Sequence, residues 1–399
     1  MSVLTLGECF IHAVKHADGS WQHMPAGYML NVSVALRRLG RTVRFVTDFG
    51  LDADGTLLTD YLAAHSVELW LREDAQRNNP TSVLTSLATG EELLTSRPGL
   101  GATSPATLSP TSIPPVLTEQ PASPAPSIPA NGAVNPAHPI ASAHPNASAG
   151  PLADAMLNEE RQPAVSNRLD FTWDIQDTPV SGACVLDLEM LAPRSVAFGG
   201  AGCHTAPGAA KVRHWVEQLR ETTSVFYHLG LPPGFAVASA QLRKQTEAFV
   251  PLTDVVCTSR KQMAQLYGGK DMLTVARHWQ ELGAALVVVT DDAGASFIPR
   301  VGGPLRVQAL ARPVDAAGAD EAFFAALIDG ISRASLDGPH GKTTLQALTG
   351  EALEALGSYA TAAAAVAASR TGVYPPSREE VISVSEARQV SDEPITTAV

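Results

Sequence analysis

The chain has 399 residues, of which 45% are hydrophobic and 17% charged, and its formal net charge is −12 at pH 7. This length and composition suit one or two domains with a large apolar core. The acidic balance argues against nucleic acid or an anionic membrane surface as the main partner, so we expect neither.

Cysteine spacing and hydropathy restrict the class further. The four cysteines are scattered without paired spacing, so neither a zinc site nor a disulfide framework is indicated. No apolar run approaches the length of a membrane span, and the N-terminus, MSVLTLGE, lacks a signal-peptide pattern. We therefore expect a cytoplasmic protein.

The first ninety residues predict short strands and two helices. A helix over Asn31–Leu39 has apolar residues at helical spacing and stops at Gly40. A hairpin is expected around the turn Asp18-Gly19. The remaining expectations are strands at 3–6, 43–47 and 81–88, and a loop and helix over 50–67 with Gly50, Asp52 and Gly55 as turn residues.

From about Pro98 to Pro163 the chain is rich in Pro, Ala and Ser and lacks the clustered large apolar residues that a core needs. We interpret residues 98–166 as a disordered insertion with polyproline character, more plausibly a solvated linker than a partner-binding segment. Residues 169–173 alternate like a strand. The insertion would then replace the turn of a hairpin formed by 81–88 and 169–173.

From residue 195 onward, predicted strands alternate with helices. The strands are expected at 195–200, 224–230, 254–259 and 285–295, and the helices over 212–219, 238–249, up to 266, up to 282, and over the Ala-rich segment 353–368. Continuous β-branched runs between amphipathic helices indicate parallel strands covered on both faces. The expected fold class is therefore α/β, with a doubly wound core and two early β segments left over as a flap.

The stretch PVDAAGADEAFFAALIDGI, residues 313–331, predicts a long apolar helix with two carboxylates, Asp320 and Glu321, in its first turn. A helix start offers free backbone N–H groups and a partial positive charge, which suit an anion. A carboxylate there can act as a base. The alternative, which the stretch alone favours, is a capped core helix whose acidic residues complement the helix dipole.

The order of the motifs resembles the ribokinase-like (PfkB) sugar kinases, over essentially the whole chain apart from the insertion. GECFIHAV is similar to the family's first strand, AGYMLNVSVALRRLG to its glycine-rich signature, VVVTDDAGA to its nucleotide-side loop and VDAAGADEAF to its last signature; PTSVLTSLATGE and RLDFTW look like the lid arms. The resemblance implies a mostly parallel sheet with helices on both faces and a small β lid. It further implies one kinase domain over 1–97 and 167–390, with lid strands within 9–24, 81–90 and 168–174, and a flexible tail over 391–399.

By this resemblance, the protein phosphorylates a sugar hydroxyl with ATP and Mg²⁺, and a loop binds K⁺. Phosphoryl transfer depends on positioning and charge stabilisation. Carried over residue by residue, the family roles are an anion hole at Gly318, Ala319 and Asp320, a catalytic base at Glu321, sugar-binding positions at His12, Gly27 and Asn31, nucleotide-binding positions at Thr290, Asp292 and Gly294, and a monovalent-cation loop at Asp315. Asn31 has the alternative role of capping its helix.

Several positions depart from the family pattern, namely His12 for an Asp, Ala26 and Asp292 for glycines, Ser259 and Gln262 for an Asn and a Glu, Asp320 for the anion-hole glycine and Glu321 for the catalytic Asp. The extra methylene of Glu321 moves the carboxylate by about an ångström, which can cost on the order of 100-fold in rate. Repulsion between Asp320 and a phosphate at about 4 Å is roughly 4 kcal/mol.

Two hypotheses follow from the departures. One is an active sugar kinase of the fructokinase kind; the other is a catalytically degenerate protein that binds a sugar, a nucleotide or a protein partner. A nucleoside kinase is a third, weaker alternative. The expected partners are a sugar and ATP, and dimerisation through the lid stays open.

Overall fold

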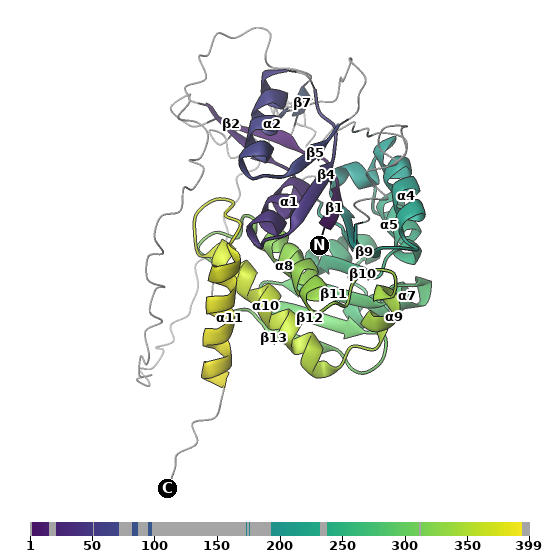
Figure 1. The fold of residues 1–399 in the computed structure, drawn as a ribbon. Helices are drawn as coiled ribbons and strands as arrows, with labels where there is room; N and C mark the ends of the chain where they lie inside the picture. Colours follow the sequence, from purple (N-terminus) through teal and green to yellow (C-terminus); the bar gives the residue numbers. More distant parts are fainter. Residues whose placement is uncertain are drawn as a thin grey trace, which may run out of the picture. The chain divides into compact units, whose positions relative to one another are not determined.

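A nine-stranded sheet forms the centre of the fold, in the order β13-β12-β11-β10-β9-β8-β1-β4-β5 (Figure 1). The computed structural model describes residues 2–15, 21–50, 52–71, 82–86, 95–97, 173, 175, 193–231, 238–310 and 313–392. The predicted insertion over 98–166 lies outside the described residues.

The strands of this sheet are β1 (Ser2–Leu6), β4 (Thr42–Val46), β5 (Glu68–Trp70), β8 (Ser195–Gly199), β9 (Ser224–His228), β10 (Val255–Ser259), β11 (Leu286–Asp291), β12 (Gly294–Pro299) and β13 (Leu305–Gln308). Neighbouring strands from β5 to β11 run parallel, and β12 and β13 add an antiparallel edge. The predicted α/β fold with a mostly parallel sheet is confirmed.

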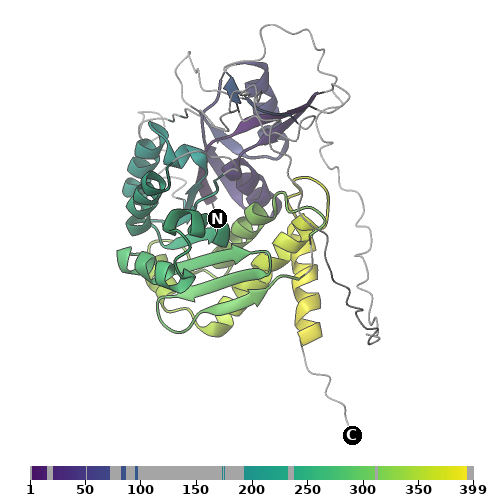
Figure 2. The same ribbon diagram turned by 180° about the vertical axis from the view of Figure 1, so that it is seen from behind.

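Helices cover both faces of the sheet, as Figures 1 and 2 show from opposite sides. Side chains alternate between the faces along each strand, so in β1 Val3 joins one apolar cluster, and Leu4 and Leu6 join the other. The first cluster contains side chains of α1 (Tyr28–Arg38), α2 (Ala53–Ala64), α8 (Ala319–Arg333), α9 (Gly341–Gln346), α10 (Gly350–Ala368) and α11 (Arg378–Asp392). The second contains side chains of α4 (Gly208–Leu219), α5 (Ser239–Phe249), α6 (Arg260–Tyr267) and α7 (Met272–Leu282).

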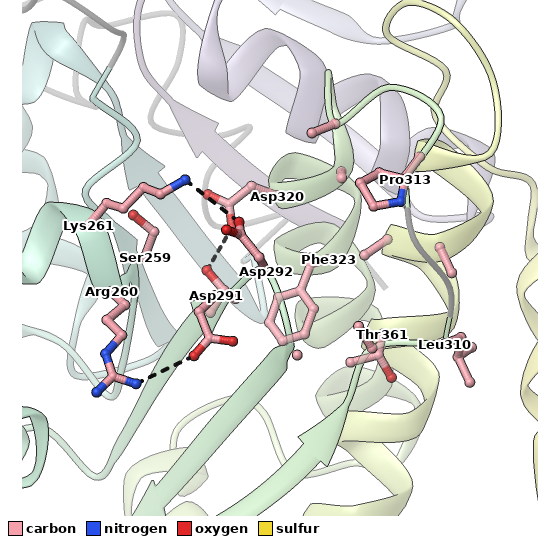
Figure 3. A pocket seen from close by; sticks show the side chains of 18 of the residues that line it. Ser259, Arg260, Lys261, Asp291, Asp292, Leu310, Pro313, Asp320, Phe323 and Thr361 are labelled. Atoms are coloured by element: carbon pink, nitrogen blue, oxygen red, sulfur yellow. Dashed lines mark hydrogen bonds and ion pairs between the residues drawn. The ribbon is translucent and has the colours of Figure 1, made fainter. Parts of the chain in front are cut away.

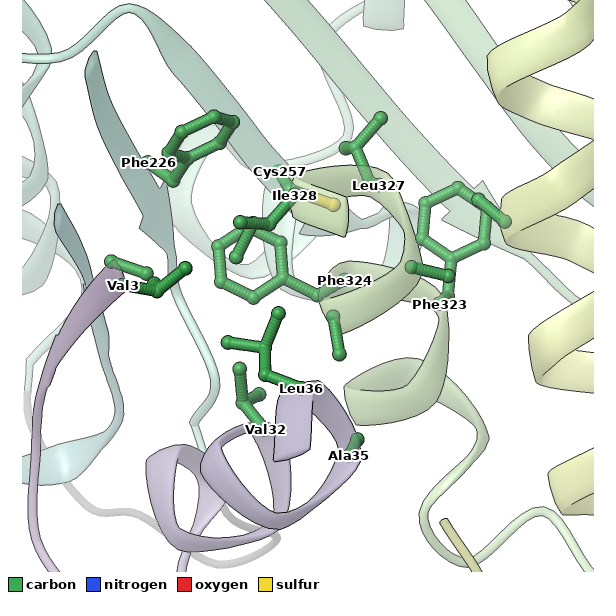
Figure 4. Close-up of a cluster of buried hydrophobic side chains, with 14 of the residues drawn as sticks. Val3, Val32, Ala35, Leu36, Phe226, Cys257, Phe323, Phe324, Leu327 and Ile328 are labelled. Atoms are coloured by element: carbon green, nitrogen blue, oxygen red, sulfur yellow. The ribbon is translucent and has the colours of Figure 1, made fainter. Parts of the chain in front are cut away.

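Helix α8 is deeply packed on the first face. It contacts α1 and α10, and Figure 4 shows Phe324 and Ile328 among side chains of α1 and the sheet. Near its C-terminal end, the buried carboxylate of Asp329 pairs with Arg41 and accepts a hydrogen bond of 2.7 Å from the Tyr359 hydroxyl. These partners compensate the charge that α8 buries.

A second sheet has four strands in the order β3-β2-β6-β7, with β2 at Phe10–Lys15, β3 at Trp21–Ala26, β6 at Ser82–Ser86 and β7 at Thr95–Arg97. β2 and β3 form the predicted antiparallel hairpin. β6 lies parallel to β2 and antiparallel to β7.

The lid strand expected at 168–174 is described only at Trp173, which belongs to no strand. The hairpin expected between 81–88 and 169–173 therefore rests on residues outside those described and stays a prediction; among the described residues, β6 pairs with β2 and β7. Trp173 is buried, and its carbonyl accepts a hydrogen bond of 3.1 Å from the N–H of Gly208. This apolar residue packs in the core because α4 begins directly against it.

Other differences are small. Gly55, expected as a turn residue, lies inside α2, and it must be glycine because a Cβ there would meet the carbonyl oxygen of Gly50 at 2.1 Å. Asp52 caps that helix. α11 extends to Asp392, two residues into the predicted tail. Within the part of the chain that the structure describes, no helix is long and apolar enough to cross a membrane.

Candidate active site

The centre of the sheet contains a topological switch point. From β1 the chain continues to β4 and β5 on one side, and from β8 it builds the other side. Open α/β sheets bind ligands at the carboxyl ends of strands at such a point. Glu8 follows β1 there, and its two carboxylate oxygens accept hydrogen bonds of 2.9 Å from the N–H groups of Ala201 and Gly202.

These contacts make Glu8 part of the scaffold. Its side chain is buried, and burial raises its pKa although the backbone hydrogen bonds oppose that shift. Gly200 has φ +90°, and a Cβ at this position would lie 2.4 Å from a carboxylate oxygen of Glu8. The loop after β8 therefore packs around the Glu8 carboxylate.

Helix α8 starts where the sequence predicts. Gly318 is its N-cap in the left-handed conformation, with φ +79°, and Ala319 is the first helical residue. Asp320 and Glu321 lie in the first turn, where backbone N–H groups lack intrahelical partners. The two carboxylates point to different partners.

Glu321 meets Asn31, a residue from the opposite end of the chain. The Asn31 side-chain amide donates a hydrogen bond of 3.1 Å to Oε1 of Glu321. Burial raises the pKa of Glu321 and the charge of Asp320 adds to the shift, whereas the Asn31 hydrogen bond opposes it. The capping alternative for Asn31 is wrong, because α1 begins at Tyr28 with Gly27 as its N-cap.

Gly27 has a structural reason to be glycine. Its φ is +131°, and a Cβ would lie 2.6 Å from the carbonyl oxygen of Glu8. The backbone after β3 therefore passes very close to the backbone after β1, at the start of the helix that carries Asn31. The sugar contact expected of Gly27 stays a prediction.

Asp320 faces the ends of two strands. Its Oδ1 accepts a hydrogen bond of 3.1 Å from the Thr290 hydroxyl on β11, and its Oδ2 lies 3.1 Å from Nε2 of His228 on β9. Burial would raise the pKa of Asp320, but His228, Thr290 and Tyr28 together hold it below its ordinary value. Neighbouring carboxyls with opposed pKa shifts are suited to different chemical roles.

A pocket of about 590 Å³ opens beside Asp320, between α8, α10, the start of α6 and the loop after β11 (Figure 3). Its walls include Leu310, Phe323 and the alanines of α10. The residues that line it are Ser259, Arg260, Lys261, Ala264, Thr290, Asp291, Asp292, Gly294, Ala309, Leu310, Pro313, Ala316, Ala319, Asp320, Phe323, Thr361, Ala364, Ala365 and Ala368. The pocket brings together the predicted nucleotide positions and part of the predicted anion hole.

Charges of both signs surround the mouth of this pocket. Lys261 lies 3.6 Å from Asp292, and Arg260 lies 3.7 Å from Asp291. The Asp292 side chain is 93% exposed, so it lies in solvent. Gly294 has φ +134°, and a Cβ there would meet a backbone carbonyl oxygen at 2.1 Å, so pairing of β12 and β13 already requires glycine.

Asp315 connects two loops. Its Oδ1 accepts from the N–H of Ala317 at 2.9 Å and its Oδ2 from the N–H of Gly372 at 2.8 Å. These two bonds, with Gly372 first, lower the pKa of Asp315. The carboxylate therefore ties the loop before α8 to the loop after α10.

The remaining expected positions are less closely grouped. His12 lies on β2 in register with Met24 of β3, and it does not line the pocket. Ser259 caps α6, accepting from the N–H of Gln262 at 3.2 Å, and the Gln262 amide donates to the carbonyl of Leu231. Among the described residues, no group of three or more His, Cys, Asp or Glu side chains is arranged to hold a metal ion.

Sequence reasoning missed His228, Tyr28 and Lys261. Lys261 carries a charge into the pocket mouth, and Tyr28 stacks on His228. One signal was present for His228: it lies near the end of the strand predicted over 224–230, and the carboxyl ends of parallel strands form the edge of the sheet where ligands bind.

The family comparison agrees with this geometry. Residues 220–380 match the family model described as pfkB family carbohydrate kinase. Over these residues the resemblance to the PfkB family is confirmed. No curated protein matches the chain.

Solved structures with similar folds come from several carbohydrate kinases. A fructokinase from Xylella fastidiosa with bound ATP has a TM-score of 0.64 and 17% identity, covering 97% of this chain and 99% of its own. An aminoimidazole riboside kinase from Salmonella enterica has a TM-score of 0.60 and 16% identity, covering 96% and 100%. A fructokinase double mutant from Vibrio cholerae, solved with fructose, ADP and potassium, has a TM-score of 0.60 and 16% identity, covering 96% and 98%. These similarities establish the ribokinase-like fold.

Proposed function

We propose that the protein is an ATP-dependent carbohydrate kinase that phosphorylates a sugar hydroxyl, of the fructokinase kind. The contact between Asn31 and Glu321 carries this proposal, since it joins the candidate sugar-side residue to the candidate base at the start of α8. The pfkB family match and the fold of the similar kinases support it.

The pocket suits a nucleotide. Its volume of about 590 Å³ lies in the usual range for small-molecule sites, its apolar wall suits a purine, and Lys261 and Arg260 suit phosphates. When bound, Mg-ATP supplies the phosphoryl group. The carboxylates that line the pocket, Asp291, Asp292 and Asp320, fit a magnesium ion that arrives with the nucleotide. Mg²⁺ is commonly held by one or two carboxylates together with substrate phosphates.

In the proposed reaction Glu321 accepts the proton of the sugar hydroxyl, and Asn31 orients the carboxylate. The N–H groups at the start of α8 stabilise negative charge on the transferred group. Asp315 shapes the loop proposed to bind K⁺, with both its oxygens already accepting backbone N–H groups.

A second candidate is a degenerate protein that binds a sugar or nucleotide without phosphoryl transfer. The observation that favours it is Asp320, whose side chain is 34% exposed beside the pocket and carries a negative charge. Repulsion of roughly 4 kcal/mol at about 4 Å would oppose a phosphate there unless a cation lies between them.

A coupled assay with Mg-ATP and a panel of hexoses, pentoses and 2-keto-3-deoxy acids separates the two candidates. Turnover that falls at least about 100-fold in Glu321→Gln supports the kinase with Glu321 as base. No turnover with any sugar, together with no thermal shift on adding ATP, would contradict it. A cytoplasmic location, a homodimer formed through the lid, and a single kinase domain over 1–97 and 167–390 stay predictions.

A further inference from the structure

His228 is held in a closed compartment at the end of β9. Its ring stacks on Tyr28, with centroids 4.5 Å apart and planes at 15°, and it packs against Phe324 at 5.1 Å. The side chain has no solvent exposure. Gly230 completes the compartment: it has φ +56°, and a Cβ there would lie 2.7 Å from the Tyr28 ring.

Hydrogen bonding fixes the tautomer of this imidazole. The N–H of Gly230 donates to Nδ1 of His228 at 2.8 Å, so Nδ1 is an acceptor and carries no proton. The ring proton of the neutral imidazole is therefore on Nε2. Nε2 lies 3.1 Å from Oδ2 of Asp320 but is not aligned with it as a hydrogen bond, and it has no hydrogen-bond partner among the described residues.

The Asp320 carboxylate has an alternative set of partners, the backbone N–H groups at the start of α8. A carboxylate in the first turn of a helix is attracted to the backbone N–H groups there, because they lack intrahelical partners and lie at the positive end of the helix dipole. Such self-capping would occupy the donors that an anionic ligand needs. In the structure the carboxylate instead faces His228 and Thr290, at the ends of β9 and β11.

We propose that His228 is a positioning residue that keeps the start of α8 open for an anionic ligand. The close electrostatic approach of its Nε2–H, together with the hydrogen bond from the Thr290 hydroxyl, holds the Asp320 carboxylate on the sheet side, away from the first-turn N–H groups. Tyr28 strengthens this arrangement, because it stacks on the imidazole and its hydroxyl lies 3.4 Å from the backbone carbonyl of Asp320. The role as an aid to nucleotide binding rests on the proposed kinase function.

The test is a double-mutant cycle with Mg-ATP as the probe, measured by calorimetry on the full chain. His228→Phe keeps a stacked ring but removes the donor, and we expect it to weaken binding roughly tenfold. In an Asp320→Ala background there is no carboxylate to cap the helix, so adding His228→Phe should change the affinity less than about twofold. An equal loss in both backgrounds would mean that His228 acts only through packing and would overturn the proposal.

A second measurement does not depend on nucleotide binding. Hydrogen exchange at the amides of Asp320 and Glu321 should slow in His228→Phe, since the released carboxylate caps them, and Asp320→Ala should reverse the effect. Thr290→Val, which removes the other donor without changing side-chain volume, should slow exchange in the same direction. Unchanged exchange in both single variants, or imidazole ¹⁵N spectra showing a proton on Nδ1, would overturn the proposal.

The two measurements also separate failure of the inference from failure of the proposed function. If the wild-type chain binds no Mg-ATP, the proposed nucleotide use is wrong, and the exchange and tautomer results still decide the role of His228. If the wild type binds Mg-ATP and the cycle shows no coupling, the kinase proposal stands and the His228 proposal falls.

Discussion

The side-chain amide of Asn31 donates a hydrogen bond to Oε1 of Glu321, across 290 positions of sequence. One residue lies in the first turn of α1 and the other in the first turn of α8, so the two helix starts converge on one carboxylate. This carboxylate has a raised pKa, and the amide is the contact that opposes the shift most.

If Glu321 is the base, activity should require its deprotonated form. Because its pKa is raised from the ordinary value of 4.5, kcat/KM should fall on the acidic side at a higher pH than an ordinary glutamate would give. Asn31→Ala removes a contact that lowers this pKa, so the acidic limb should move to still higher pH. The pH profile with Mg-ATP and the best sugar measures both effects.

A suitable control for that profile is Gln218→Ala on the exposed side of α4, which should leave the limb in place. If Asn31→Ala lowers activity equally at all pH values, the amide positions the substrate and does not tune Glu321.

Glu8 should matter for stability. Glu8→Gln replaces one acceptor oxygen by an NH₂ group that would face a backbone N–H of Ala201 or Gly202. An unsatisfied buried donor costs about 1–3 kcal/mol, so the urea midpoint of unfolding should fall accordingly. Glu217→Gln, in an exposed pair with Arg213, should change stability by less than about 1 kcal/mol. Equal midpoints for Glu8→Gln and wild type would show that Glu8 does not hold the loop.

His204 should make stability depend on pH. It is buried, Nδ1 lies 2.8 Å from the Gly200 carbonyl and Nε2 lies 2.7 Å from the Tyr227 hydroxyl, and burial lowers its pKa to about 4. In the unfolded chain His204 has a pKa near 6.5 and binds the proton more readily. The stability that depends on neutral His204 is therefore fully present above about pH 6.5 and is lost as the pH falls towards 4. Its full size is about 3 kcal/mol.

Denaturation of wild type and His204→Gln between pH 4 and 7.5 tests this expectation. The free-energy gap between the two should narrow as the pH falls, because only the wild type carries the histidine. His340→Gln, at an exposed position, should show the same dependence of unfolding free energy on pH as the wild type. Parallel curves for wild type and His204→Gln would contradict the assignment.

The Arg41–Asp329 pair should be costly to break from one side. Arg41→Met keeps the aliphatic stem but leaves the buried carboxylate of Asp329 without its cation, which costs about 3–5 kcal/mol. Arg213→Met, which breaks the exposed pair with Glu217, should cost less than about 1 kcal/mol. If both variants lose the same free energy of unfolding, measured by heat or denaturant, the buried Arg41–Asp329 pair contributes no more than an exposed pair.

Local sequence patterns predicted much of this fold. β10 was expected over 254–259 and lies at Val255–Ser259, and the start of α8 at Gly318-Ala319 was recognised from its residues. Such features depend on neighbouring residues, through periodicity and helix-start chemistry. The pairing of β6 with β7 was not predicted, because partner choice between short strands depends on tertiary packing and the residues of β7 show no strand pattern of their own.

The site was predictable in its positions and less so in its contacts. Asp320 was identified, but the direction of its carboxylate depends on Thr290 and His228, which come from separate strands. Asn31 and Glu321 were assigned to different roles, and only the packing of α1 against α8 brings them together.

The polar contacts of Asp329 affect the orientation of α8, and through it the position of Glu321 at the start of the helix. Eight residues, or about 12 Å of helix, separate Asp329 from Glu321. Arg41 and Tyr359 both contact the Asp329 carboxylate, so rotating α8 about its axis or shifting it along that axis would break these contacts. A one-residue slip would turn the helix start by about 100° and carry Glu321 away from Asn31. The direction of the Glu321 carboxylate thus depends on the contacts of Asp329, about two helical turns away.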